Sequence, residues 1–146
     1  MSDVAERLAI QDLTARYSFY TDTLQMEPWL SLWTEDGVFD ETSTGTGYHE
    51  GQGALRVLFR QIEDIMADQV HFGGSHIIEV HSDSEATGIL YAIGEGHTRQ
   101  GGYVRAVIYY DDVYRKVGGK WRFAKRKVTP LLPFDTSNFV AGMQQS

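Results

Sequence analysis

Four long strand candidates in the second half of the chain constrain the fold more than any other feature. Alternating side chains predict strands over residues 70–81, 85–98, 103–116 and 120–129, separated by the short turns "HSDS", "RQGG" and "VGGK". Strands joined by such turns are antiparallel neighbours, so the pattern predicts a four-stranded meander.

Helices are predicted ahead of this meander. Apolar side chains at helical spacing indicate an amphipathic helix over residues 2–22, a short helix over residues 28–35 and a third helix over residues 53–69. Residues 38–41 are predicted to form a short strand, and residues 42–51 a loop or irregular hairpin. Helices followed by strands indicate the α+β class. We expect helices in the concave face of a curved mixed or antiparallel sheet, giving a cone-shaped α+β barrel with an apolar interior open at one end.

Length and composition favour one domain over residues 1–146, with residues 130–146 as a C-terminal tail. Phe134, Phe139 and Val140 suggest that the tail packs on another surface, for example that of a neighbouring subunit. The net charge is −7 and there is no long basic run, which argues against nucleic acid or an anionic membrane as a partner.

The absence of cysteine excludes disulfides, cysteine-based zinc sites and thiol nucleophiles. The chain starts with a polar, helical segment that does not resemble a signal peptide, and no apolar run approaches membrane-spanning length. A soluble, cytoplasmic protein is the expectation.

The stretch "VHFGGSHIIEV" places His71 two residues before a pair of glycines. Glycine weakens a strand unless a bulge requires it, and a bulge at Gly73–Gly74 would re-aim His71. The alternative is an ordinary strand histidine with one satisfied hydrogen bond. His71, His76 and His81 are spaced by five, which sends neighbours to opposite faces of a regular strand, so no metal site is expected. His76 is interpreted as a structural or surface residue.

Asp22 lies near the end of the first predicted helix, where the helix dipole disfavours a carboxylate. Its neighbours are mostly aromatic or apolar. Asp22 is therefore either a solvated turn residue or a buried carboxylate held by an arginine or histidine.

Arg126 lies on the last predicted strand. Strict alternation puts it on one face with Ala124 and Val128, and puts Trp121 and Phe123 on the other face. It is either a charge in an apolar setting or a surface arginine lying along the sheet.

Three segments resemble the SnoaL-like branch of the nuclear transport factor 2-like superfamily, near the group that holds scytalone dehydratase and γ-hexachlorocyclohexane dehydrochlorinase. They are "AIQDL" followed by Asp22, "VHFGGS" with His71, and "WRFAKR" with Arg126, and the resemblance covers about residues 5–130. It implies a catalytic dyad inside the cone, with His71 as general base and Asp22 as the acceptor that orients it. It implies that Arg126 stabilises developing negative charge, and that no metal or organic cofactor is needed.

The residues expected to contact the substrate depart from those of the two relatives. A tyrosine stands where the dehydrochlorinase has a lysine, and Thr21 stands where the dehydratase has a tyrosine. A pocket tyrosine of the dehydratase aligns near Glu41, and a pocket histidine of that enzyme aligns near His97 with a one-residue shift. Tyr109 or Tyr110 stands where the dehydratase has a polar residue in its pocket. Neither activity therefore transfers. The substrate-binding set expected from the sequence is Tyr17, Tyr20, Thr21, Phe39, Met66, His97 and Tyr109.

Three functions remain open from the sequence. The first is a cofactor-independent lyase that removes water or halide from a small, mainly apolar, cyclic molecule. The second is an isomerase or cyclase with the same base, and the third is a module that binds a hydrophobic ligand without catalysis. We also expect a homo-oligomer, because five aromatic residues of the strands cannot all line one small pocket: Tyr103, Tyr109, Tyr110, Tyr114 and Trp121. The resemblance implies a dimer or a trimer, and it favours the trimer.

Overall fold

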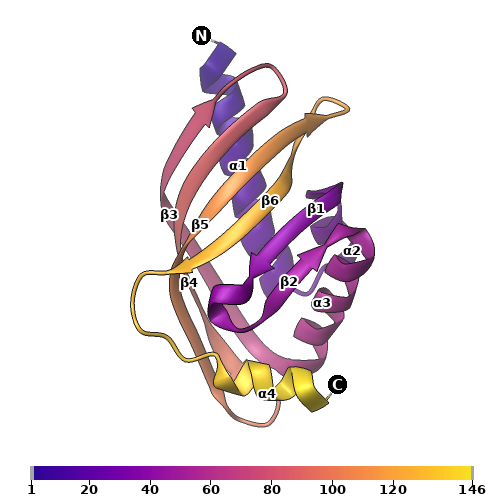
Figure 1. The fold of residues 1–146 in the computed structure, drawn as a ribbon, viewed down its shortest axis with the longest axis vertical. Helices are drawn as coiled ribbons and strands as arrows, with labels where there is room; N and C mark the ends of the chain where they lie inside the picture. Colours follow the sequence, from indigo (N-terminus) through magenta and orange to yellow (C-terminus); the bar gives the residue numbers. More distant parts are fainter. Residues whose placement is uncertain (1, 146) are drawn as a thin grey trace.

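The computed structural model describes residues 2–145 and shows long strands curving across the first helix, with the shorter helices gathered at one end (Figure 1). The elements in order are α1 (Ser2–Asp22), α2 (Met26–Leu30), β1 (Trp33–Glu41), the 3₁₀ helix η1 (Thr42–Thr44), β2 (Gly47–Glu50), α3 (Gly51–Ile65), β3 (Met66–Val80), β4 (Glu85–Thr98), β5 (Tyr103–Val117), β6 (Lys120–Pro130) and α4 (Ser137–Gln145).

One six-stranded sheet has the order β2-β1-β6-β5-β4-β3. The four long strands pair antiparallel in chain order, which confirms the predicted meander. β1 pairs parallel to β6 and antiparallel to β2, so the sheet is mixed. Helices packed against a curved mixed sheet confirm the predicted α+β class and architecture.

Three predicted boundaries differ from those observed. α2 ends at Leu30 because the chain enters β1 at Trp33, which pairs with Phe123 of β6. α3 ends at Ile65, and β3 begins at Met66 opposite Thr98, several residues earlier than predicted. The segment expected as a loop or irregular hairpin contains η1 and β2, which forms a hairpin with β1. In each case pairing across the sheet overrides the local pattern.

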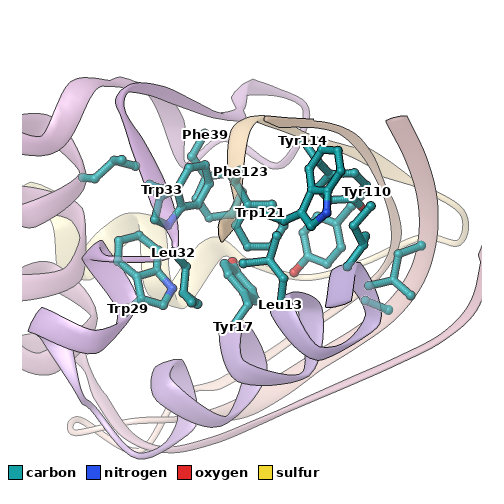
Figure 2. Packing of buried hydrophobic residues seen from close by; sticks show 14 of the residues in the cluster. Leu13, Tyr17, Trp29, Leu32, Trp33, Phe39, Tyr110, Tyr114, Trp121 and Phe123 are labelled. Atoms are coloured by element: carbon teal, nitrogen blue, oxygen red, sulfur yellow. The ribbon is translucent and has the colours of Figure 1, made fainter. Parts of the chain in front are cut away.

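Tyr17 occupies the centre of the core. Its ring projects from α1 among aromatic rings of α2 and the sheet (Figure 2). The centroid of the Tyr17 ring lies 6.1 Å from Trp29, 5.9 Å from Tyr110 and 5.6 Å from Phe123. Packing of this kind fixes the position of α1 against β5 and β6.

A bulge in β6 overturns the predicted alternation on that strand. Tyr114 pairs with Phe123 and Val113 pairs with Lys125, so Ala124 has no partner of its own. The extra residue rotates the following part of the strand, and Arg126 faces the core on the same side as Phe123. Arg126 is therefore not a surface residue.

A second bulge lies in β3, but not at the glycine pair. Gly74 pairs with Tyr91 and His76 pairs with Leu90, which leaves Ser75 as the extra residue, with φ at +54°. Because of this residue, His71 and His76 both point to the helix side despite their odd spacing. His76 Nε2 lies 3.0 Å from the hydroxyl of Tyr114, so His76 is a structural residue.

The C-terminal tail packs on its own chain, in contrast to the suggested neighbouring subunit. Phe139 of α4 contacts Ile65 and Met66 at the α3–β3 junction. The Thr136 hydroxyl donates to the carbonyl of Thr44 at 2.8 Å. α4 thereby covers the end of the cone where α3 meets the sheet (Figure 1). Among residues 2–145, no helix is long and apolar enough to cross a membrane.

Candidate functional site

The centre of the candidate site is a hydrogen-bonded pair formed by His71 of β3 and Asp22, the last residue of α1. Nδ1 of His71 lies 2.6 Å from Oδ1 of Asp22, and the backbone N–H of His71 donates to Oδ2 at 2.9 Å. The side chains are only 22% and 19% exposed, respectively. Since a carboxylate accepts, the Nδ1 proton is held on the Asp22 side, which leaves Nε2 of the neutral imidazole free to take a proton.

The end of α1 is anchored to β3 beside this pair. The side-chain amide of Gln69 donates to the carbonyl of Thr21 at 2.9 Å, and the Thr21 hydroxyl donates to the carbonyl of Tyr17 at 2.7 Å. The bond from Gln69 joins the last turn of α1 to β3 and gives a partner to one of its carbonyl groups, whereas the bond from Thr21 lies within the helix. The helix dipole opposes a carboxylate at this end, and the two hydrogen bonds from His71 offset that cost for Asp22.

Gly94 of β4 makes room for the His71 ring. The two residues are paired across the strands. A Cβ atom on Gly94 would lie 3.1 Å from Cδ2 and 3.2 Å from Nε2 of His71, which is tighter than an ordinary contact. The imidazole thus packs on bare backbone, and a side chain at this position would push it away from its place.

A pocket of about 120 Å³ opens beside the dyad. An apolar cavity of about 150 Å³ accommodates benzene, so this space suits a molecule of about one ring. The exposed surface of the wall is mainly apolar, although ten of its twenty lining residues carry a polar group: Tyr17, Thr21, Glu41, Thr44, Thr46, Gln69, His71, Glu95, Tyr110 and Thr136. An apolar pocket with a few convergent polar groups is typical of a small-molecule site. Among residues 2–145, no group of three or more His, Cys, Asp or Glu residues is arranged to hold a metal ion.

Arg126 lies behind the pocket wall and is not among the lining residues, which corrects the expectation that it reaches the substrate. It is fully buried, and its Nε and Nη2 each donate to Asp112 at 2.8 Å. The guanidinium carbon lies 3.7 Å from the ring centroid of Tyr110 and 4.4 Å from that of Tyr17, both of which line the pocket. Burial alone would lower the pKa of Arg126, but the Asp112 carboxylate outweighs burial and holds the pKa above its usual range.

Glu41, the last residue of β1, brings a carboxyl group to the pocket. Its side chain is 20% exposed. Burial raises the pKa of Glu41 to about 7, a rise that the Thr46 hydroxyl opposes and that Asp40 reinforces. Burial also raises the pKa of Tyr110 to about 12, so this phenol is neutral near pH 7.

Comparison with known proteins agrees with this architecture. The sequence profile of the SnoaL-like domain matches residues 2–127. The chain belongs to the SnoaL-like domain family. This confirms the resemblance seen in the sequence. No functionally curated protein matches this SnoaL-like chain in sequence.

Solved structures give the same fold. A proposed aromatic ring hydroxylase from Novosphingobium aromaticivorans is 26% identical, with a TM-score of 0.88 over 93% of this chain and 97% of that one. LinA is 27% identical, with a TM-score of 0.79 over 92% of each chain. LinA is a hexachlorocyclohexane dehydrochlorinase. A proposed scytalone dehydratase from N. aromaticivorans, 21% identical over 90% of this chain and 89% of that one, has a TM-score of 0.83 and supports the fold alone.

Four of the seven expected substrate-binding residues of this SnoaL-like protein line the pocket: Tyr17, Thr21, Phe39 and Met66. The other three lie elsewhere. The Tyr20 hydroxyl accepts from Arg16 on the outer side of α1, at 2.9 Å. His97 is exposed and pairs with Asp68 at 3.0 Å, and the Tyr109 ring lies beside that of Tyr91 on the neighbouring strand, with the ring centroids 6.5 Å apart.

These corrections follow from strand geometry. Neighbouring residues of a strand point to opposite faces, so Tyr110 lines the pocket and Tyr109 does not. In the sequence, only alignment with a pocket tyrosine of the dehydratase indicated Glu41, and no pattern indicated Gln69 or Glu95, which also line the pocket. The alternation along β5 was visible in the sequence, but nothing local showed which of its faces is the inner one.

Proposed function

We propose that this SnoaL-like protein is a cofactor-independent lyase that removes water or halide from a small, mainly apolar, cyclic molecule. The observation that carries the proposal is the hydrogen-bonded pair of His71 and Asp22 at a ring-sized pocket. In the proposed reaction, Nε2 of His71 takes a proton from a carbon next to the one that bears the leaving group. Asp22 stabilises the imidazolium that forms.

The surroundings of the dyad support this chemistry. Tyr17 and Tyr110 line the pocket with pKa values raised by burial, so both phenols keep their protons near neutral pH. The Tyr17 hydroxyl donates to that of Tyr110, and the Tyr110 O–H is the donor available to an oxygen of the substrate. Arg126 acts through them as a positioning residue, because its guanidinium lies against both rings. LinA, 27% identical, is a dehydrochlorinase, and this likeness favours elimination as the reaction class.

The two alternative functions, an isomerase or cyclase and a binding module, would depend on His71 in different ways. An isomerase or cyclase would return the proton to the molecule and conserve its mass, whereas a lyase releases water or halide. A binding module would hold a ligand with no dependence on the base. The ordered tautomer of His71 favours catalysis over binding alone, because a ligand held by apolar contacts does not require it.

Replacement of His71 by glutamine tests the proposal. The wild type is incubated in deuterated buffer with scytalone, γ-hexachlorocyclohexane and a set of cyclic ketones, and NMR records deuterium uptake and product. We expect the variant to lose these reactions by about 100-fold or more, since a general base contributes about 10²–10⁴-fold. Product of unchanged mass would indicate the isomerase.

The exposed pair of His97 and Asp68 provides a matched control. Asp68 accepts from both Nδ1 and the backbone N–H of His97, as Asp22 does from His71, but this pair lies outside the pocket. His97→Gln should leave every rate within about threefold of the wild type. Equal loss in both variants, or full turnover in His71→Gln, would contradict the proposed role of the dyad.

We also propose that the protein is a homo-oligomer, with a trimer favoured. The outer face of the sheet carries Phe72, Ile77 and Tyr91, which are 70%, 61% and 50% exposed, an apolar surface that a second copy would cover. Light scattering should give a multiple of the 16.5 kDa chain mass, and Phe72→Asp should reduce it to one chain. Val57→Asp on α3, equally apolar and 56% exposed but away from the sheet face, should not. A monomeric wild type would refute this assembly.

A further inference from the structure

One acidic group of the pocket has no role in proton abstraction by His71. Glu41 lines the same pocket as His71, and among residues 2–145 only one ion-pair partner lies within 4 Å of its carboxyl group. That partner is His49, whose Nε2 lies 3.7 Å from Oε1 of Glu41. However, Nε2 of His49 is 2.9 Å from the carbonyl of Thr46, which makes this nitrogen a donor to the backbone. Burial lowers the pKa of His49, so its ring is neutral near pH 7.

The charge environment of Glu41 favours its protonated form. No lysine or arginine is present among the described residues that line the pocket. Asp40, the preceding residue, adds negative charge. The other titratable groups that share the pocket or lie directly behind its wall are Tyr17 on α1, His71 on β3, Glu95 on β4, Tyr110 on β5 and Arg126 on β6. The charge of Arg126 is already neutralised by Asp112, so Arg126 does not favour ionisation of Glu41. The carboxyl group of Glu41 can therefore keep its O–H inside the pocket.

Acid and base therefore share one ring-sized cavity. A protonated carboxyl group and an imidazole base are the two kinds of group that general acid–base catalysis requires. Hydroxide is a poor leaving group and departs readily only when an acid protonates it, whereas halide ions leave without a proton. A buried acid next to a base has a use in dehydration that it lacks in dehydrohalogenation.

We propose that Glu41 is the general acid of this site and that the group it protonates is a hydroxyl leaving group. This inference rests on the proposed lyase function and narrows its leaving group to hydroxyl. His71 removes the proton from a carbon next to the one that bears the hydroxyl group, and that electron pair forms the C=C bond. As the C–O bond breaks, the Glu41 O–H protonates the departing oxygen, and water leaves. The imidazolium then returns its proton to the Glu41 carboxylate through solvent, which restores both groups without a co-reactant.

Two probes that differ only in the leaving group test the inference. 3-Hydroxycyclohexanone and 3-chlorocyclohexanone both yield cyclohex-2-enone, which is followed by ultraviolet absorbance after subtraction of the uncatalysed rate. Glu41→Gln should lose about 100-fold or more in turnover of the hydroxy ketone and stay within about threefold of the wild type on the chloro ketone. Glu41→Asp, which retains an acid on a shorter arm, should recover part of the lost rate.

The controls separate the two proposals. Glu35→Gln, an exposed residue on the same strand, should leave both rates unchanged, and circular dichroism checks that every variant is folded. His71→Gln should lose both reactions. If His71→Gln is inactive, and Glu41→Gln either lowers the turnover of both ketones equally or changes neither, only the proposed role of Glu41 is refuted. If His71→Gln keeps its turnover, the lyase mechanism itself fails. A wild type that is inert towards the hydroxy ketone but converts the chloro ketone would refute hydroxyl as the leaving group.

Discussion

Asp112→Ala is expected to reduce the free energy of unfolding by about 3–5 kcal/mol, because it leaves the Arg126 charge buried without a partner. Both side chains are fully buried, and Asp112 accepts two bonds from Arg126 and one from the Tyr114 hydroxyl at 2.7 Å. The Arg126 side chain has no exposed surface, so bulk solvent does not replace these bonds. Urea unfolding followed by fluorescence measures the loss.

An exposed ion pair supplies the control. Arg16 and Asp12 on α1 are 54% and 61% exposed, and Asp12→Ala should cost less than about 1 kcal/mol. The double variant Asp112→Leu with Arg126→Met should be more stable than Asp112→Ala, because it removes both buried charges and leaves an apolar pair. A cost below about 1 kcal/mol for Asp112→Ala would show that the Arg126 charge is solvated by another route.

Glu41→Gln is expected to be more stable, relative to the wild type at the same pH, at about pH 8 than at about pH 4. The quantity compared is the difference in the free energy of unfolding between the two proteins. The folded-state pKa of Glu41 is about 7 against an ordinary value of 4.5, so the folded state holds a proton that the unfolded state has released. Stability of the wild type therefore falls as pH rises through this window. At about 1.4 kcal/mol for each tenfold change in acidity, the expected difference is about 3 kcal/mol.

Urea unfolding of both proteins across this pH range measures the effect, and other groups cancel in the difference. His49 has the opposite dependence, because burial lowers its pKa and its contribution is lost as pH falls, but it is present in both proteins. Glu35→Gln should show no such trend, since that side chain is exposed. A difference that does not change with pH would mean that Glu41 is ionised in the folded state, and it would remove the basis for Glu41 as an acid.

Local patterns predicted which segments become helices and strands, but they left open whether Asp22 is a solvated turn residue or is held by a partner. Helical and strand periodicities depend only on neighbours along the chain, so α1, the stripe of α3 and the four-stranded meander could be found without coordinates. The resemblance paired Asp22 with His71, and the distance of 2.6 Å between Oδ1 and Nδ1 agrees with that pairing.

Long-range pairing decided the composition of the pocket. One extra residue at Ser75 and another at Ala124 reverse the side-chain direction along β3 and β6, and these bulges bring His76 and Arg126 to the inner face. The same pairing buries Glu41 and turns Tyr110 inward. Bulges arise where two paired strands must fit both each other and a curved core. Because the paired strands are separated along the chain, no short stretch of the sequence contains both of them. The chain alone therefore specified its elements, and the family resemblance supplied the pairing of Asp22 with His71, while tertiary packing determined which other groups share the pocket and in what protonation state.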